Sequence, residues 1–432
     1  MQQNGRVGAA LDDRPVRLVV RDDDLARSRL TVALRLLLAI PHLLWVALWG
    51  IAALLAAVGL WLVIVVGGKA PAALHDFVAG FLRYATHVSA YLYLAADAYP
   101  GFRGAPGYAI DLEIAPPARQ SRWTALGRLV LALPALALAT ALAGGLSTGP
   151  GPAWWATSEG DRSASWLGLT TVGVVGVAAF LAWFAILARG HAPRGLRDVQ
   201  AYALAYGAQA GGYLLLLTDR YPTSSPELAE AFADLPEHPV RIEVTDDLER
   251  SRLTVLFRPL LAIPHVVWLA LWTIAVLVAV LAAWITALVT ARVPGSLQRF
   301  LAAWVRYDLH VNAFLFLVGR RFPGFRGRDS SYGIDVRIEP AHRLDRGKVL
   351  FRAVLVVPAL LLTSALAAVL LVIAVLAWPY GLVTGRMPEG LRDLGATCLR
   401  YAAQTWAYLL LLTDRYPYAA PVLAPRGGGD VR

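Results

Sequence analysis

The chain has 432 residues, of which 57% are hydrophobic and only 16% are charged, and its mean hydropathy is +0.54. Because soluble domains carry about 25% charged residues, this composition is typical of a membrane protein and excludes an ordinary soluble domain. The net charge of +10 comes without any basic run interleaved with aromatic residues, so we expect no nucleic-acid partner. The single cysteine, Cys398, excludes an intrachain disulfide.

One pattern occurs four times: an Arg followed six residues later by a Pro, at the start of a long apolar run. The four arginines are Arg35, Arg128, Arg258 and Arg352. Self-similarity of this kind marks a repeat architecture, so we divide the chain into four repeats. They cover residues 15–104, 108–225 (with an inserted loop at 147–165), 239–328 and 332–421, between a polar tail at 1–14, a linker at 226–238 and a disordered tail at 422–432.

Each repeat opens with a short segment in which β-branched and polar residues alternate. The four segments are Val16–Val20, Ile110–Ile114, Val240–Val244 and Ile334–Ile338. A period of two predicts a half-buried strand. We expect the four strands to form one small sheet on the cytoplasmic side, because lone strands cannot leave their edges in lipid. In the second segment the alternation turns Asp111 and Glu113 toward water.

Acidic clusters follow the strands of the first and third repeats, at 22–24 and 246–247, and an Arg-Ser-Arg triplet comes next. Acidic and serine residues before an apolar run suit the start of a helix, so we interpret the clusters as helix caps. A metal site built from the paired carboxylates is the alternative interpretation.

The apolar runs that follow are long enough to cross a bilayer and have cations at both ends. Cations mark the cytoplasmic side, so each run should cross an even number of times. We interpret each run as a helical hairpin with its tip near the middle, at Trp49-Gly50 in the first repeat. The alternative is an interfacial helix up to the Pro, then one crossing, with the next segment crossing back.

Both interpretations predict the same fold class: an all-α polytopic membrane protein with internal repeats and about eight transmembrane passes. Interfacial amphipathic helices and a small extramembrane β-sheet complete the predicted architecture. The repeated Arg35, Arg128, Arg258 and Arg352 lie at the mouths of the runs, with no acidic partner at a fixed spacing. We expect them to anchor the helices to anionic lipid headgroups, with Arg→Lys substitutions mild at every position.

The last apolar segment of each repeat carries a thin polar stripe. In three repeats an Arg and a His or Gln are four residues apart, which places them on one helix face: Arg83 with His87, Arg306 with His310, and Arg400 with Gln404. We expect these helices to lie at the headgroups with the stripe in contact with lipid phosphate. An intramembrane proton relay is the alternative. For His42 and His265, which follow the Pro of their runs, we expect an interfacial position rather than metal ligation.

These motifs together resemble one family. Arg-Ser-Arg-Leu-Thr-Val at 27–32, Ala-Ile-Pro-His at 39–42 and Thr-Asp-Arg-Tyr-Pro at 218–222 are similar to the DUF4389 domain of bacterial membrane proteins with no assigned function. The second repeat departs from the pattern through its insertion and through Ala205 in place of the Arg. The resemblance implies a multipass membrane location and no particular activity.

No catalytic or cofactor motif is present in the sequence, so we expect neither an enzyme nor a cofactor or metal site. We expect a scaffold or an assembly and regulatory factor for cell-envelope proteins, held in the bacterial inner (plasma) membrane with both termini cytoplasmic. A transporter or a carrier of lipids or small solutes, built from the paired repeats, is the alternative. The expected partners are the lipid bilayer with its anionic headgroups and another membrane or envelope protein.

Overall fold

The computed structural model describes residues 14–21, 24–144, 173–230, 236–328, 332–339 and 343–423. These residues form two compact units, Met1–Ser224 with Leu228–Ala233 and Ser225–Glu227 with Asp234–Arg432, called here the first half and the second half. Each half contains two of the four repeats. The insertion expected at 147–165 and nearly all of both expected tails lie outside the described residues.

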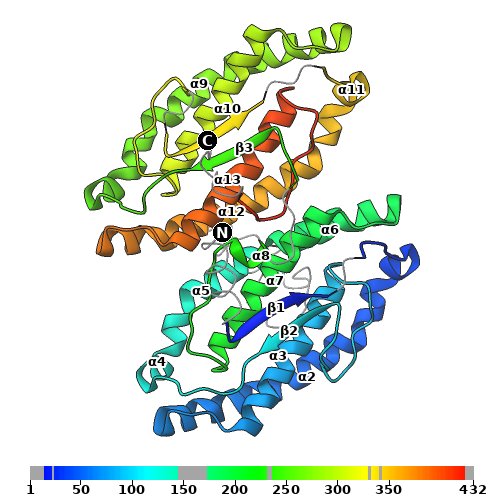
Figure 1. Ribbon diagram of the computed structural model, residues 1–432, viewed down its shortest axis with the longest axis vertical. Helices are drawn as coiled ribbons and strands as arrows, with labels where there is room; N and C mark the ends of the chain where they lie inside the picture. Colours follow the sequence, from blue (N-terminus) through cyan, green and yellow to red (C-terminus); the bar gives the residue numbers. More distant parts are fainter. Residues whose placement is uncertain are drawn as a thin grey trace, which may run out of the picture. The chain divides into compact units, whose positions relative to one another are not determined.

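The two halves share the order strand, two helices, strand, and after it the described residues form four helices in the first half and three in the second (Figure 1). In the first half they are β1 (Val16–Val20), α2 (Arg29–Gly67), α3 (Ala72–Leu92), β2 (Ile110–Ile114), α4 (Arg122–Leu126), α5 (Arg128–Ala143), α6 (Gly173–Arg189) and α7 (Arg194–Leu214). After the short α8 (Glu227–Glu230), the second half has β3 (Val240–Val244), α9 (Arg252–Thr290), α10 (Gly295–Leu315), β4 (Ile334–Ile338), α11 (Arg346–Leu355), α12 (Val357–Thr384) and α13 (Glu389–Leu409).

The first apolar run is one helix of 39 residues, not a hairpin. Helix α2 begins after Ser28, whose side chain accepts a hydrogen bond from the Thr31 N–H, and it ends at Gly68 with φ +73°. Pro41 lies inside it, and the helix passes the expected tip at Trp49-Gly50 without a break. Helix α9 repeats this with 39 residues. The hairpin prediction is therefore wrong for these repeats, because each helix runs unbroken from its serine N-cap to a left-handed C-cap residue, Gly68 or Ala291.

In the second repeat, α5 and α6 together replace one long helix. The buried positions of the last part of α2 recur in α6 at the same spacing: Ala53, Leu60 and Ile64 in the one, and Val175, Ala182 and Ile186 in the other. The ends of α5 and α6 meet, since a Cβ placed on Gly173 would lie 2.3 Å from the Gly144 N. The insertion therefore joins two helices that continue one another.

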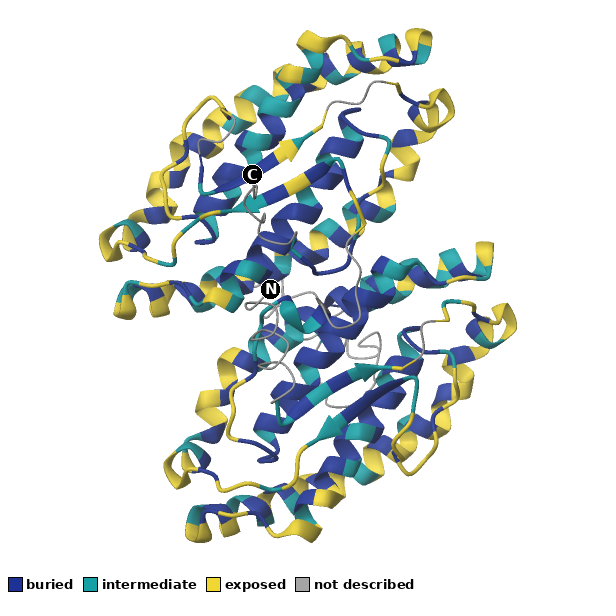
Figure 2. Ribbon diagram, in the orientation of Figure 1, coloured by how far each residue is buried: buried dark blue, intermediate teal, exposed yellow. Residues whose placement is uncertain are grey.

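Three helices are long and apolar enough to cross a membrane: Arg29–Gly67, Arg252–Thr290 and Val357–Thr384. The predicted count of about eight passes is not supported in the part of the chain that the structure describes. In each half the long helices lie at the outer edges, with the shorter helices and the strands between them (Figure 1). The outer faces of the long helices expose apolar side chains, whereas the inner helices are largely buried (Figure 2).

The four strands form two separate antiparallel pairs, β1 with β2 and β3 with β4. The register pairs Val16 with Ile114 and Val240 with Ile338. The prediction of a single four-stranded sheet is therefore wrong, because each half completes its own pair. In the first half the pair packs on α3 and α7, where Ile110 and Leu112 join a core formed with Val78, Leu82 and Val88.

The long helices of each half are joined at both ends. At the start of α2, the Arg27 N–H donates to the Gly190 carbonyl beyond α6 (2.9 Å), and at its end the Gly68 carbonyl accepts from the Gln120 N–H before α4 (2.9 Å). The second half repeats this frame, with Arg250 N–H to the Gly385 carbonyl (2.7 Å) and Leu344 N–H to the Ala291 carbonyl (2.9 Å). Each half thus holds its strands and inner helices inside a frame of apolar helices.

Candidate functional site

The last helix of every repeat (α3, α7, α10 and α13) ends in the same left-handed turn. The residues with positive φ there are Leu94, Leu216, Leu317 and Leu411, with φ between +61° and +66°. A left-handed conformation costs a non-glycine residue roughly 1–2 kcal/mol, so it persists only where the surroundings enforce it. The turn also leaves carbonyl groups at the helix end in need of donors.

Arg35 supplies these donors in the first repeat. Its Nη1 donates to the carbonyls of Tyr91 (2.7 Å) and Ala96 (2.8 Å), on either side of the turn. The guanidinium lies 4.3 Å from the centre of the Tyr91 ring, and the residue is only 2% exposed. A cation at a helix C-terminus also complements the helix dipole. Arg35 therefore clamps the end of α3 onto α2.

The other three arginines repeat this clamp. The Nη1 of Arg128 donates to the Thr218 carbonyl (2.9 Å). The Nη1 of Arg258 donates to the carbonyls of Phe314 (2.8 Å) and Gly319 (3.0 Å). The Nη1 of Arg352 donates to the carbonyls of Tyr408 (2.6 Å) and Thr413 (3.0 Å). All are 1–2% exposed.

Two of the clamp arginines also have an acidic partner. Arg35 pairs with Asp97 (2.6 Å) and Arg352 pairs with Asp414, each from the closing motif of the same repeat. The expectation of no acidic partner at a fixed spacing is therefore wrong for these two. Anchoring of the four arginines to lipid headgroups stays a prediction, while the structure gives each guanidinium buried acceptors within the protein.

A second buried arginine supports the same turn in the first and third repeats. Arg250, from the Arg-Ser-Arg triplet, donates to the carbonyls of Leu317 (3.2 Å) and Val318 (2.8 Å) and to Asp246 (2.7 Å). Arg27 binds the Ala95 carbonyl in the first repeat (3.2 Å).

The acidic cluster of the third repeat does not cap the helix. Asp246 accepts from Arg250 and from the Arg320 N–H (2.9 Å), and Asp247 pairs with Arg320. The capping interpretation is therefore wrong for these two carboxylates, which lie five and four residues before Ser251, the N-cap of α9. In the part of the chain that the structure describes, no group of three or more His, Cys, Asp or Glu side chains could hold a metal ion.

A buried histidine–aspartate pair joins α3 to the strands in the first half. The Nε2 of His87 lies 2.9 Å from the Asp111 Oδ1, and the two residues are each 1% exposed. The Gly107 N–H also donates to Asp111 (2.7 Å), and Tyr108 stacks on the imidazole with ring centres 4.6 Å apart. The sequence prediction that Asp111 meets water is wrong, because the strand turns this carboxylate onto α3.

The hydrogen bonds keep this carboxylate ionised. Burial by itself would raise the pKa of Asp111, but the donors at Gly107, His87 and Leu112 outweigh it and hold the pKa below its ordinary value. Burial lowers the pKa of His87, so the imidazole is neutral at pH 7 and its Nε2–H donates to the carboxylate.

The second half repeats the pair. His310 Nε2 lies 3.0 Å from Asp335 Oδ1, and the Arg306 Nε lies 3.5 Å from the same oxygen. Tyr332 stacks on His310 with ring centres 4.7 Å apart. Among the residues described, the buried Asp335 Oδ2 has no hydrogen-bond partner. Burial would raise the pKa of Asp335, but the bond from His310 and the Val336 N–H keep it low.

The polar stripe of the fourth repeat binds backbone instead of an acid. Arg400 donates to the carbonyls of Ala420 and Val422, and the Gln404 Nε2 donates to the Val240 carbonyl (3.0 Å). The predicted contact of the stripes with lipid phosphate stays a prediction. The structure places all three stripes against strands or extended segments of their own half.

The two histidines after the Pro residues are fully buried. His42 Nδ1 lies 2.6 Å from the Tyr84 hydroxyl, and His265 Nδ1 lies 2.8 Å from the Tyr307 hydroxyl. Each ring stacks on a phenylalanine, Phe102 or Phe325, at 4.4 Å. They join the long helix to the middle of the inner helix, and their interfacial position in a membrane stays a prediction.

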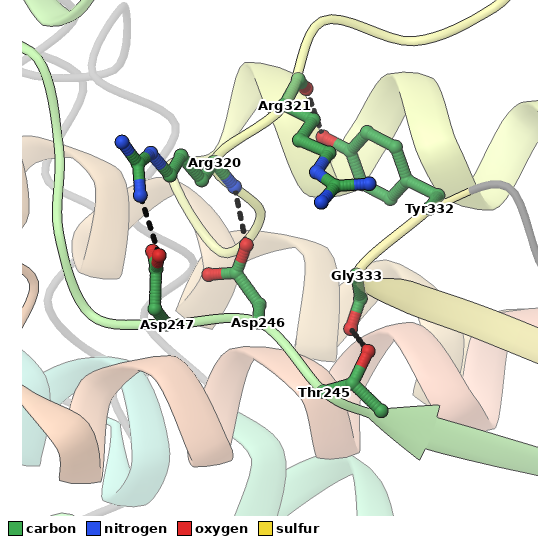
Figure 3. A pocket seen from close by; sticks show the side chains of 7 residues that line it. All are labelled: Thr245, Asp246, Asp247, Arg320, Arg321, Tyr332 and Gly333. Atoms are coloured by element: carbon green, nitrogen blue, oxygen red, sulfur yellow. Dashed lines mark hydrogen bonds and ion pairs between the residues drawn. The ribbon is translucent and has the colours of Figure 1, made fainter.

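A polar pocket of about 510 Å³ opens beside Tyr332, whose ring stacks on His310. Its walls are Thr245, Asp246, Asp247, Arg320, Arg321, Tyr332 and Gly333 (Figure 3). Two acidic and two basic side chains line it, and the ring of Tyr332, whose hydroxyl donates to the Arg321 carbonyl (2.6 Å), lies between the pocket and His310. Charges of both signs therefore line the pocket, with Asp247 and Arg320 paired to each other.

Sequence reasoning found the arginine and histidine positions but missed their partners. Asp111 and Asp335 occupy the same place in the Ile-Asp-x-x-Ile strands of the second and fourth repeats, and this recurrence was the available signal. Tyr108 and Tyr332, just before those strands, were missed as well.

Comparison with known proteins gives one result. The sequence profile of the domain of unknown function DUF4389 matches residues 29–103, 168–225, 252–325 and 346–420, well over half of the chain. No curated protein and no solved structure matches. The first, third and fourth matched segments each contain a clamp arginine and the helix whose end it binds, whereas the second contains α6 and α7 but not Arg128. The chain therefore belongs to the DUF4389 family, whose domain it carries four times in tandem.

Proposed function

We propose that this protein is a scaffold of the bacterial plasma membrane that holds another envelope protein against its polar strand face, with both termini in the cytoplasm. The observation that carries the proposal is that the buried arginines bind groups within the protein itself. Arg35, Arg258 and Arg352 bind carbonyls at the ends of the protein's own helices. Buried charges are costly, and here they stabilise a rigid frame.

The exposed surfaces support the same role. The outer faces of the long helices expose leucines such as Leu37 (63%) and Leu55 (69%), which suit lipid. The strand side of the second half exposes charges around the pocket, where the side chains of Asp247 and Arg320 are 53% and 45% exposed. Charges of both signs at the rim of a pocket favour a partner with a complementary charged segment.

Site-specific photo-crosslinking in cells tests this proposal. We would place a photoreactive amino acid at Asp247 in the pocket and, as a matched control, at Leu37 on the outer face of α2. The scaffold proposal predicts a discrete protein adduct at position 247 and only lipid adducts at position 37. The adduct at 247 should disappear when Arg321 is also changed to Glu, with protein abundance unchanged.

The alternative function gives a different result. A carrier of lipids or small solutes predicts that position 247 yields lipid or small-molecule adducts without a protein adduct. It also predicts that purified protein in liposomes moves a solute or lipid between compartments or leaflets. Either outcome would overturn the scaffold proposal.

A further inference from the structure

The strands of each half lie alongside the inner helices, not beyond their ends. In the first half, β2 is joined to the body of α3 through the His87–Asp111 pair and through Arg83, whose Nε donates to the Leu112 carbonyl (2.8 Å). In the second half, His310 of α10 pairs with Asp335 of β4 in the same way. The depth of the inner helix in a membrane therefore fixes the depth of the strands.

In the first half, the long helix α2 lies beside α3 over the whole length of α3. Arg35 contacts Tyr91 near the end of α3, His42 contacts Tyr84 in its middle, and a Cβ on Gly59 would meet Leu74 at its beginning. Helix α2 is thus antiparallel to α3. If α2 crossed a bilayer, the strands packed on α3 would lie at the level of the hydrocarbon core.

The strands cannot lie in hydrocarbon. Arg17 and Glu113 form an ion pair across the strands (2.7 Å) with side chains 41% and 43% exposed, and Arg337 and Glu243 form one in the second half with 68% and 43% exposed. A two-stranded sheet also has two open edges, whose N–H and C=O groups need water. Open edges facing lipid do not occur at membrane depth.

The dimensions of the long helices point the same way. A helix of 39 residues measures about 58 Å at 1.5 Å per residue, nearly twice the ~30 Å hydrocarbon core. To fit within the core it would have to tilt by about 60°, whereas membrane-spanning helices tilt by about 0–40°. Cations also stand at both ends, Arg29 and Lys69 in the first half and Arg252 and Arg292 in the second, which places both ends on one side.

We propose that each half is monotopic: its long helices lie lengthwise in the acyl region of one leaflet, and its strand face stays in water on the same side as both helix ends. The partner of the apolar edges is the bilayer itself, with anionic headgroups beside the flanking cations. A continuous helix with both ends on one side does not cross the membrane. This placement replaces the multipass arrangement expected from the apolar runs alone.

Thiol labelling tests the proposal with the full-length chain in a Cys398→Ser background. Single cysteines at Ser28 and Lys69 mark the two ends of α2, and a cysteine at Glu113 marks the strands. An impermeant maleimide should label all three in inside-out vesicles and none in right-side-out vesicles. Cysteines at Ser251 and Arg292 form the matched pair for α9. Labelling of the two ends of either helix from opposite sides would overturn the proposal.

The depth of α2 in the bilayer gives a second test, which does not depend on the side of the membrane that the helix ends face. Spin labels at Leu37, Leu48, Leu55 and Leu62, all exposed on α2, should have nearly the same accessibility to oxygen relative to a water-soluble relaxant. A label at the buried Ala53 serves as the control for a site inside the protein. In a helix that crosses the bilayer, the depth of the label would rise from one end to a maximum near the middle and fall again toward the other end. That result would contradict the monotopic placement.

Discussion

At the scale of the residue, the arginine clamp shows why the identity of the cation matters. Arg352 has its planar guanidinium over the Tyr408 ring, with the ring centre 4.5 Å away, while it binds two carbonyls and Asp414. Lysine has a point charge and cannot reproduce this planar set of donors. The charge alone would suffice for a lipid anchor, but it does not suffice for the clamp.

Arg352→Lys should therefore destabilise the second half, in contrast to the mild effect expected from sequence. We expect a loss of about 2–4 kcal/mol in the free energy of unfolding, since buried hydrogen bonds of charged groups contribute about 1.5–3 kcal/mol each. Denaturant unfolding in detergent micelles measures it. Arg29→Lys is the matched control, because Arg29 is exposed and makes one carbonyl contact, with Ala188. Equal, small effects at both positions would show that Arg352 needs only its charge.

A buried histidine should make the second half sensitive to acid. Burial lowers the pKa of His238 to about 4, and the nearby positive charge of Arg400 also lowers it. The unfolded chain, with an ordinary pKa of about 6.5, takes up the proton first as the pH falls. Stability should thus be constant above pH 6.5 and fall by on the order of 3 kcal/mol between pH 6.5 and 4. His238→Gln should remove that part of the slope in unfolding measurements across pH, and an unchanged slope would contradict this assignment.

One glycine lies where a side chain cannot fit. Gly327 has φ +53°, and a Cβ there would lie 2.3 Å from the Ala303 carbonyl oxygen on α10. Gly327→Ala should destabilise by roughly 2–5 kcal/mol, from left-handed strain and from the displacement of backbone. Gly324→Ala is the control, since nothing lies within 4 Å of a Cβ at that position. Thermal unfolding of the two variants compares them, and similar melting temperatures would show that the loop simply moves aside.

At the scale of the element, the capping residues set where each long helix begins and ends. A proline removes one backbone donor, yet α2 continues through Pro41 because its remaining hydrogen bonds and its buried stripe hold it. The expectation of a turn at Trp49-Gly50 relied on charge symmetry and not on a helix stop. The helix ends where a left-handed glycine, Gly68, stops it.

Removal of the insertion should preserve the second repeat. Because Gly144 and Gly173 are in contact, direct joining of these two residues with deletion of 145–172 should leave α5 and α6 in place. We expect a change in the free energy of unfolding below about 1 kcal/mol, since the ends of α5 and α6 already meet and a shorter connection costs less loop-closure entropy. Unfolding of the deletion variant measures this. Loss of abundance or of cooperative unfolding would show that the insertion supports the helix joint.

At the scale of the whole molecule, duplication explains which features recur. The histidine–aspartate pair and the second arginine of the clamp occur once in each half, whereas the clamp arginine occurs in every repeat. The repeat is therefore not a complete folding unit. Each half is a complete folding unit, because a strand from one repeat pairs with a strand from the next, and the two long helices close one frame.

The sequence by itself determined the repeats, the positions of the strands, the long apolar segments and the arginine–histidine stripes, because these follow from local spacing and composition. Only the tertiary structure decided which residues lie against each face of a strand or helix. Alternation placed Asp111 in water, but α3 lies on that side of the strand with His87 ready to bind it. Flanking charge predicted a lipid contact for Arg35, and only the fold shows that its guanidinium binds the end of α3. Those outcomes depend on contacts between segments far apart in the chain, which no local pattern encodes.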